Sequence, residues 1–172
     1  MKSVLESRLK YLYTGERFAI ILFLPLSFYI NYTYPELQLF SLLSFWISFF
    51  LLEFILMQGT YYWHSKWKCL ITENKSITPI KTVRLLWKLK AINVSIIIFS
   101  IILFVIDILV KYPSLPINGL LISGFIYIFA ILEFINYFYI QLSYDNLSDI
   151  RYLIKTKKLK RSSLSKDFKR IA

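Results

Sequence analysis

Apolar residues along the chain fall into four long runs, which cover about residues 18–34, 37–63, 91–110 and 117–142. Each run is near or above the roughly 20 residues that an α-helix needs to cross about 30 Å of hydrocarbon. The breaks within each pair of runs, at 34–36 and 111–116, are short and contain proline, so each pair should form an antiparallel hairpin. The pattern predicts an all-α, polytopic membrane protein with four transmembrane helices.

The distribution of lysine and arginine predicts how this protein lies in the membrane. Of the 21 basic residues, 20 precede the first run, separate the second from the third, or follow the fourth, and only Lys111 lies elsewhere. Cytoplasmic loops carry the excess of Lys and Arg, so both termini should be cytoplasmic. The predicted segments are a cytoplasmic basic helix (1–17), a first hairpin (18–63), a basic loop or helix (64–90), a second hairpin (91–142) and a polybasic amphipathic tail (143–172).

Composition narrows the class of protein further. Apolar residues make up 57% of the 172 residues, the mean hydropathy is +0.56 and the net charge is +11, which exclude an ordinary soluble domain. Cys69 and His64 are the only cysteine and histidine, and the chain contains no HExxH, P-loop, GxSxG or CxxC motif. We therefore expect no enzymatic activity, no cofactor and no metal.

The two hairpins share a sequence pattern. Tyr112-Pro113 follows Tyr34-Pro35 after 78 residues, and Glu133-Phe134-Ile135 follows Glu53-Phe54-Ile55 after 80. These matches suggest that one hairpin has been duplicated, with both copies in the same orientation and a pseudo-twofold axis along the membrane normal. Apolar helices also align by chance, so the duplication is a hypothesis.

Several polar residues fall within the apolar runs, where they are costly. A carboxylate at mid-bilayer costs about 2.5–3.5 kcal/mol on insertion scales, so such groups should face protein or water. The candidates for a pore or ion pathway are Glu53, Asp107, Asn118, Ser123, Glu133 and Asn136. The alternative is that polar stripes only hold helices together through interhelical hydrogen bonds. The second run has two occupied faces, which is weak support for a homo-oligomer.

Basic residues concentrate on the predicted cytoplasmic side, where they are candidates for binding an anionic ligand or lipid: Lys81, Arg84, Lys88, Lys157, Lys158, Lys160 and Arg161. Leu164 and Phe168 belong to a short apolar stripe in the tail. A segment of this kind commonly lies on an anionic leaflet. The alternative is a soluble anionic ligand, a nucleotide or an oligonucleotide, that acts on the membrane part.

The chain resembles small four-span bacterial membrane proteins labelled general stress proteins. The similar segments begin at Glu16-Arg17-Phe18, Gln58-Gly59-Thr60 and Ile131-Leu132-Glu133. In architecture it is more loosely similar to SLATT-type membrane effectors of bacterial antiviral defence, although those have one hairpin. The resemblance implies a bacterial inner membrane and a stress or defence setting.

These observations favour a non-enzymatic homo-oligomer that forms or gates an ion-conducting pore, with a basic cytoplasmic face for an anionic lipid or ligand. One alternative is a small proton-coupled transporter that uses Glu53 and Glu133. Another is a membrane scaffold that binds a partner protein through its tail.

Overall fold

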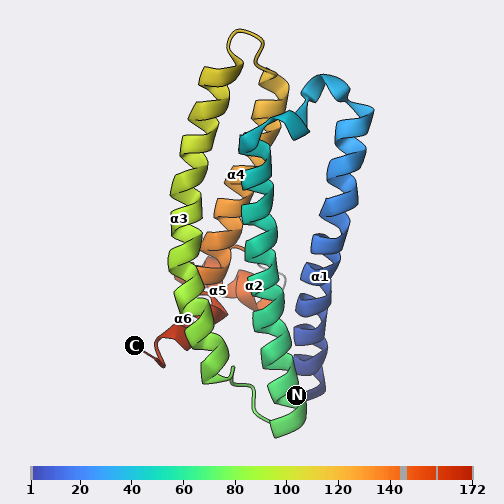
Figure 1. The fold of residues 1–172 in the computed structure, drawn as a ribbon. Helices are drawn as coiled ribbons and strands as arrows, with labels where there is room; N and C mark the ends of the chain where they lie inside the picture. The colour runs from blue at the N-terminus through green and yellow to red at the C-terminus, as the bar shows by residue number, and fades with distance from the viewer. Residues whose placement is uncertain (1, 144–146, 158, 172) are drawn as a thin grey trace.

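The computed structural model describes residues 2–143, 147–157 and 159–171, and the elements in these ranges are helical. Four long helices lie side by side (Figure 1). In chain order the elements are α1 (Lys2–Thr33), the 3-10 helices η1 (Pro35–Leu37) and η2 (Leu39–Ser41), α2 (Leu43–Glu73), α3 (Ile80–Lys111), α4 (Ile117–Phe138), α5 (Leu147–Thr156) and α6 (Ser163–Phe168).

The two ends of the bundle differ in what they contain. The N-terminus, the α2–α3 connection, α5, α6 and the C-terminus gather at one end, which we call the basic end (Figure 1). The connections from α1 to α2 and from α3 to α4 lie at the other end, which we call the loop end. Lys111, at the end of α3, is the basic residue of the loop end.

Three of the described helices, α2, α3 and α4, are long and apolar enough to cross a membrane. The first predicted span meets the same criterion only when α1 is taken together with η1 and η2, to which it is bent by 97°. Large apolar side chains such as Ile98, Phe99 and Ile102 are exposed on α3, as expected of a surface that faces lipid. A crossing of the membrane by α1 and the cytoplasmic position of the termini stay predictions.

The helices do not break at the borders of the predicted segments. Residues 2–17 and the first apolar run form one continuous helix, α1, and residues 64–90 are mostly the ends of α2 and α3. The last run does not stay helical to residue 142, because α4 ends at Phe138. Beyond it the side-chain oxygen of Asn136 accepts from the backbone N–H of Leu142 at 2.8 Å, and Ile140 pairs with Arg161 in an antiparallel bridge.

Helix α2 lies at the centre of the bundle and packs against α1, α3 and α4. Small residues on α2, Ser44, Ser48 and Gly59, are buried and let neighbouring helices approach closely. By contrast, α3 and α4 make few contacts with each other. The two hairpins therefore pack differently, and the duplication stays a hypothesis about the sequence.

Candidate binding site at the basic end

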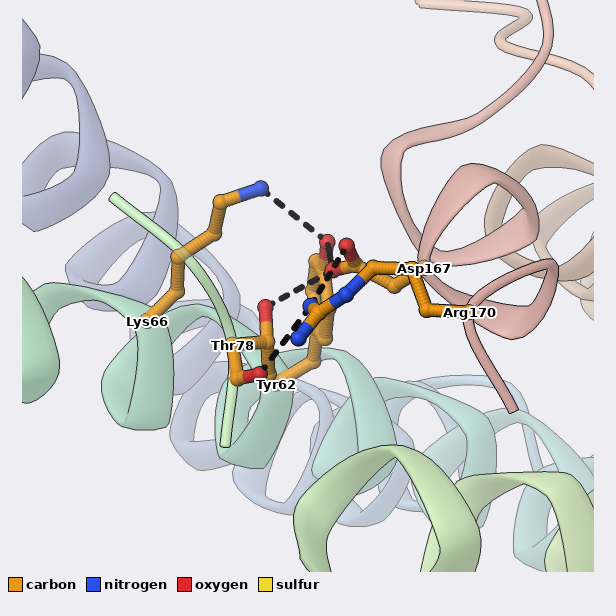
Figure 2. A network of polar contacts seen from close by, with 5 residues as sticks. All are labelled: Tyr62, Lys66, Thr78, Asp167 and Arg170. Atoms are coloured by element: carbon orange, nitrogen blue, oxygen red, sulfur yellow. Dashed lines mark hydrogen bonds and ion pairs between the residues drawn. The ribbon is translucent and has the colours of Figure 1, made fainter. Parts of the chain in front are cut away.

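The C-terminal helix α6 is fastened to the bundle by a set of polar contacts around one carboxylate, which we call the Asp167 network (Figure 2). The Tyr62 hydroxyl and the Thr78 hydroxyl each donate to Asp167 Oδ2 at 2.8 Å. Arg170 lies 3.3 Å from Asp167 Oδ1 and also donates to the Thr78 carbonyl, while Lys66 Nζ donates to the Tyr62 hydroxyl at 3.2 Å. Tyr62 lies on the central helix α2 and is only 1% exposed, so the network joins α6 directly to the interior of the bundle.

Apolar contacts reinforce this docking. Leu164 and Phe168 are buried within the main core cluster, and the Phe168 ring meets Trp87 edge-on with 5.0 Å between centroids. The Ser162 hydroxyl donates to the Tyr137 carbonyl at 2.6 Å and caps α6 by accepting from the Ser165 N–H. The prediction that this apolar stripe lies on the leaflet is therefore wrong, because Leu164 and Phe168 face the bundle.

A cavity of about 440 Å³ lies beside the docked tail, between α1, α2 and α4. Four basic side chains line it, and they come from different parts of the chain: Arg8 from α1, Lys66 from α2, Lys160 from the segment before α6, and Lys166 from α6. Two carboxylates, Glu16 and Glu133, also line it. The cavity is the place where charges from all these elements meet.

One wall of the cavity depends on a glycine. The Tyr137 hydroxyl on α4 donates a short hydrogen bond to the Glu16 carboxylate on α1. Gly59 of α2 lies against this pair: a Cβ added there would come 2.5 Å from Glu16 Oε2 and 2.6 Å from the Tyr137 ring. Any larger residue at position 59 would force Glu16 and Tyr137 to move, so Gly59 lets α1, α2 and α4 meet at this point.

The residues predicted to line an ion pathway are not brought together. Glu133 and Asn136 lie at the cavity, where Asn136 Nδ2 donates to Glu133 at 3.3 Å. Ser123 is buried and bonds the Gly119 carbonyl of its own helix, and Asn118 is exposed at the loop end. Glu53 is buried on α2, and its Oε1 has no hydrogen-bond partner among the described residues.

Asp107 has a structural role at the loop end. Helix α2 begins without a side-chain cap from its own N-cap residue, Leu42. Instead Asp107 of α3 accepts from the backbone N–H of Leu43 at 3.1 Å and of Ser44 at 2.7 Å. A carboxylate at a helix N-terminus satisfies unpaired donors and complements the helix dipole. These contacts explain the buried charge without an ion pathway.

A second polar contact ties α2 to α3 inside the bundle. Gln58 and Asn93 exchange two side-chain hydrogen bonds, at 3.0 and 2.9 Å, and both residues are buried. Sequence reasoning did not identify Gln58 as a candidate. The available signal was an Asn in the third apolar run and a Gln in the second. Their separation in the sequence does not indicate that the two side chains meet.

The predicted basic residues are spread over the basic end. Lys160 lines the cavity, while Arg84 and Lys88 line a smaller one of about 270 Å³ with Trp87 and Ile171. Lys81, Lys157 and Arg161 are exposed, and Lys158 lies outside the described residues. Sequence reasoning missed Arg8, Glu16, Lys66 and Lys166 as cavity residues.

Within the described ranges, no three His, Cys, Asp or Glu side chains are grouped so that they could hold a metal ion. No family model matches the chain, and neither a curated protein nor a solved structure matches it. What the chain does must therefore be inferred from its own residues.

Proposed function

We propose that the chain is a subunit of a homo-oligomeric ion-conducting assembly in a bacterial inner membrane, and that an anionic ligand at the basic end controls conduction. The observation that carries this proposal is the Asp167 network, which ties the basic C-terminal segment to the central helix α2 next to a cationic cavity. The protein acts without catalysis, in a stress or defence setting as its resemblances imply.

The coupling follows from where the charges lie. An anion bound among Lys66, Lys160 and Lys166 attracts the tail and α2 toward the same point. Lys66 also donates to the Tyr62 hydroxyl, which itself donates to Asp167. Ligand binding therefore changes how firmly α6 holds Tyr62, and α2 contacts each of the other long helices. This gives two states of the tail that a ligand can select between.

Conduction is expected between copies of the chain. Asp107, Ser123 and Asn93 are buried and engaged in hydrogen bonds within one bundle. An ion path through a single bundle would have to break these contacts. The assembly and its path are therefore best sought between copies, at the outer faces of the helices.

The test is the membrane potential of bacteria that produce the chain, measured with a voltage-sensitive dye at matched protein levels in the membrane. Asp167→Ala removes the acceptor of three donors and should release α6. Lys169→Ala is the matched control, because Lys169 is exposed at the end of the same helix and lies outside the network. We expect wild type and Lys169→Ala to depolarise cells equally and Asp167→Ala to differ from both.

If no form depolarises the cells, even after anionic ligands are supplied to inside-out vesicles, the chain does not conduct ions and the proposal fails. If all three forms depolarise equally, conduction stands but control through the tail is wrong.

A second candidate is proton-coupled transport, and it is favoured by one face of α2. Glu53, Thr60 and Trp67 recur every seven residues, so they share a helix face, and each has a buried polar atom without a partner among the described residues. Trp67 stacks on Tyr13 of α1, so this face points toward α1. Glu53→Gln should then abolish proton-driven solute uptake, whereas Asp167→Ala should leave it intact.

A further inference from the structure

We propose that the cavity is a groove between α1 and α4 that holds one anionic phospholipid from the leaflet at the basic end. The inference rests on the proposed function for the membrane setting and deepens it by naming the ligand as a lipid. Four observations carry it: the shape of the cavity, its gradient of polarity, its charge, and an unobstructed glycine.

The cavity is long because α1 meets α4 at few points, one of which is the hydrogen bond from Tyr137 to Glu16. Helix α1 packs along α2, but few contacts join α1 to α4. The lining follows α1 from Leu5 to Phe23, which is about 27 Å along a helix axis at 1.5 Å per residue. On α4 it runs from Phe129 to Tyr137. A groove of this shape suits an extended molecule lying parallel to the helices.

The lining changes from apolar to charged along this length. Ala19, Phe23, Leu56 and Phe129 line the part toward the middle of the bundle. The charged lining residues, among them Lys66, lie toward the basic end, together with hydroxyl-bearing residues and several leucines of α1 and α6. A phospholipid has the same order, with an acyl chain toward the bilayer centre and a phosphate at the surface. A soluble nucleotide would leave the apolar part unfilled.

The charge at the polar part favours an anionic headgroup. Among the described residues that line the cavity, Arg8, Lys66, Lys160 and Lys166 outnumber the carboxylates of Glu16 and Glu133. Both carboxylates also already accept hydrogen bonds, Glu16 from Tyr137 and Glu133 from Asn136. Basic side chains from several elements that face one cavity are the arrangement that binds phosphate oxygens.

Gly15 lies on the wall of this groove with open space in front of it. It lines the cavity, and a Cβ added to it would meet no atom within 4 Å. Replacing glycine in a helix by alanine or leucine also favours the helix by up to about 1 kcal/mol, so neither change should harm folding. Gly15→Leu therefore fills the groove, and Gly15→Ala is a matched control that leaves it open.

The first experiment places the lipid. Trp63 lines the cavity, so a variant with Trp46, Trp67 and Trp87 changed to Phe reports on the groove alone. It is reconstituted in phosphatidylcholine nanodiscs and titrated with brominated phosphatidylglycerol or brominated phosphatidylcholine. We expect saturable quenching of Trp63 by the anionic lipid at low mole fraction. Gly15→Leu should abolish this saturable component and Gly15→Ala should keep it.

The second experiment tests charge in the chain with all four tryptophans, by native mass spectrometry of lipid retained after detergent extraction. The double variant that combines Lys66→Gln and Lys166→Gln should retain phosphatidylglycerol about 30-fold more weakly than wild type. Lys68→Gln with Lys169→Gln removes the same charge from exposed positions outside the lining, and should leave retention within about twofold of wild type.

Equal quenching by both brominated lipids, or unchanged quenching in Gly15→Leu, would overturn the lipid site. Displacement of the lipid by millimolar pyrophosphate, with pyrophosphate binding unaffected by Gly15→Leu, would instead identify a soluble phosphate ligand and reject a lipid. These outcomes are independent of conduction: a retained lipid in a chain that carries no current would reject the proposed function and keep the site.

Discussion

The loop end and the basic end of the same four helices are built in opposite ways. At the loop end, the connection between α1 and α2 folds back as η1 and η2, and buries Leu37, Leu39 and Leu42 in an aromatic cluster. Its buried charge, Asp107, binds backbone N–H groups. At the basic end the helices spread around a cavity, and charged side chains bind other side chains. We infer that the loop end is the more rigid of the two and that the basic end is the one that can open.

This contrast predicts that substitutions at the loop end lower global stability, while those at the basic end act locally. The largest effect is expected at Gly119 of α4. A Cβ added there would overlap the backbone carbonyl oxygen of Leu37, which cannot rotate away. Gly119→Ala should lower the free energy of unfolding in mixed micelles by about 3 kcal/mol.

Gly124→Ala is the control on the same helix, because its added Cβ would meet the Phe104 ring only at 4.0 Å. It should be neutral or stabilising by up to about 1 kcal/mol. Equal effects of the two substitutions would mean that the loop end is not closely packed.

Loss of the Asp107 cap is the next largest effect. Asp107→Ala leaves the N–H groups of Leu43 and Ser44 without their acceptor, and should cost about 2 kcal/mol of unfolding free energy. Asp107→Asn keeps one acceptor oxygen and should cost about half as much. Unfolding of both variants in SDS titrations checks this, and a neutral Asp107→Ala would leave Asp107 free to serve an ion path.

The Gln58–Asn93 pair lies between the two ends and tests additivity. Each single change to leucine leaves the other buried amide without its hydrogen-bond partner, whereas the double change removes both amides. A double-mutant cycle on unfolding free energies should therefore give a coupling of about 1 kcal/mol. A coupling of zero would show that the two amides are independently solvated.

The smallest effect is expected at Lys90 on the basic end. Its ammonium lies 4.1 Å from the centroid of the Tyr139 ring, just beyond α4. Lys90→Met keeps the aliphatic chain and removes a cation–π contact worth about 0.5–1 kcal/mol. Limited trypsin digestion should cut the C-terminal segment faster in this variant, with little change in global unfolding. A large global effect would erase the distinction between the ends.

Sequence reasoning succeeded where periodicity alone decides the outcome. Apolar runs of span length identify α2, α3 and α4 as candidate membrane helices. The basic residues gather at one end because both termini and the α2–α3 connection lie there. The cost of burying polar groups also pointed correctly to Asp107 and Glu53 as buried.

Partners across the sequence were beyond the same reasoning. Tyr62 and Asp167 are 105 positions apart and Glu16 and Tyr137 are 121 apart, so no local pattern relates them. The tail was misjudged because a stripe such as Leu164 and Phe168 suits a membrane surface and a bundle equally. Periodicity shows that a face is apolar, but only packing shows what covers it.

The most direct test of the account is ion flux into vesicles that hold the purified chain, as phosphatidylglycerol is increased in a phosphatidylcholine background. The account predicts that flux through wild type and Gly15→Ala rises with the anionic lipid and saturates, and that flux through Gly15→Leu does not respond. Absence of flux at every composition, or the same lipid response in Gly15→Leu, would contradict control of conduction from the basic end.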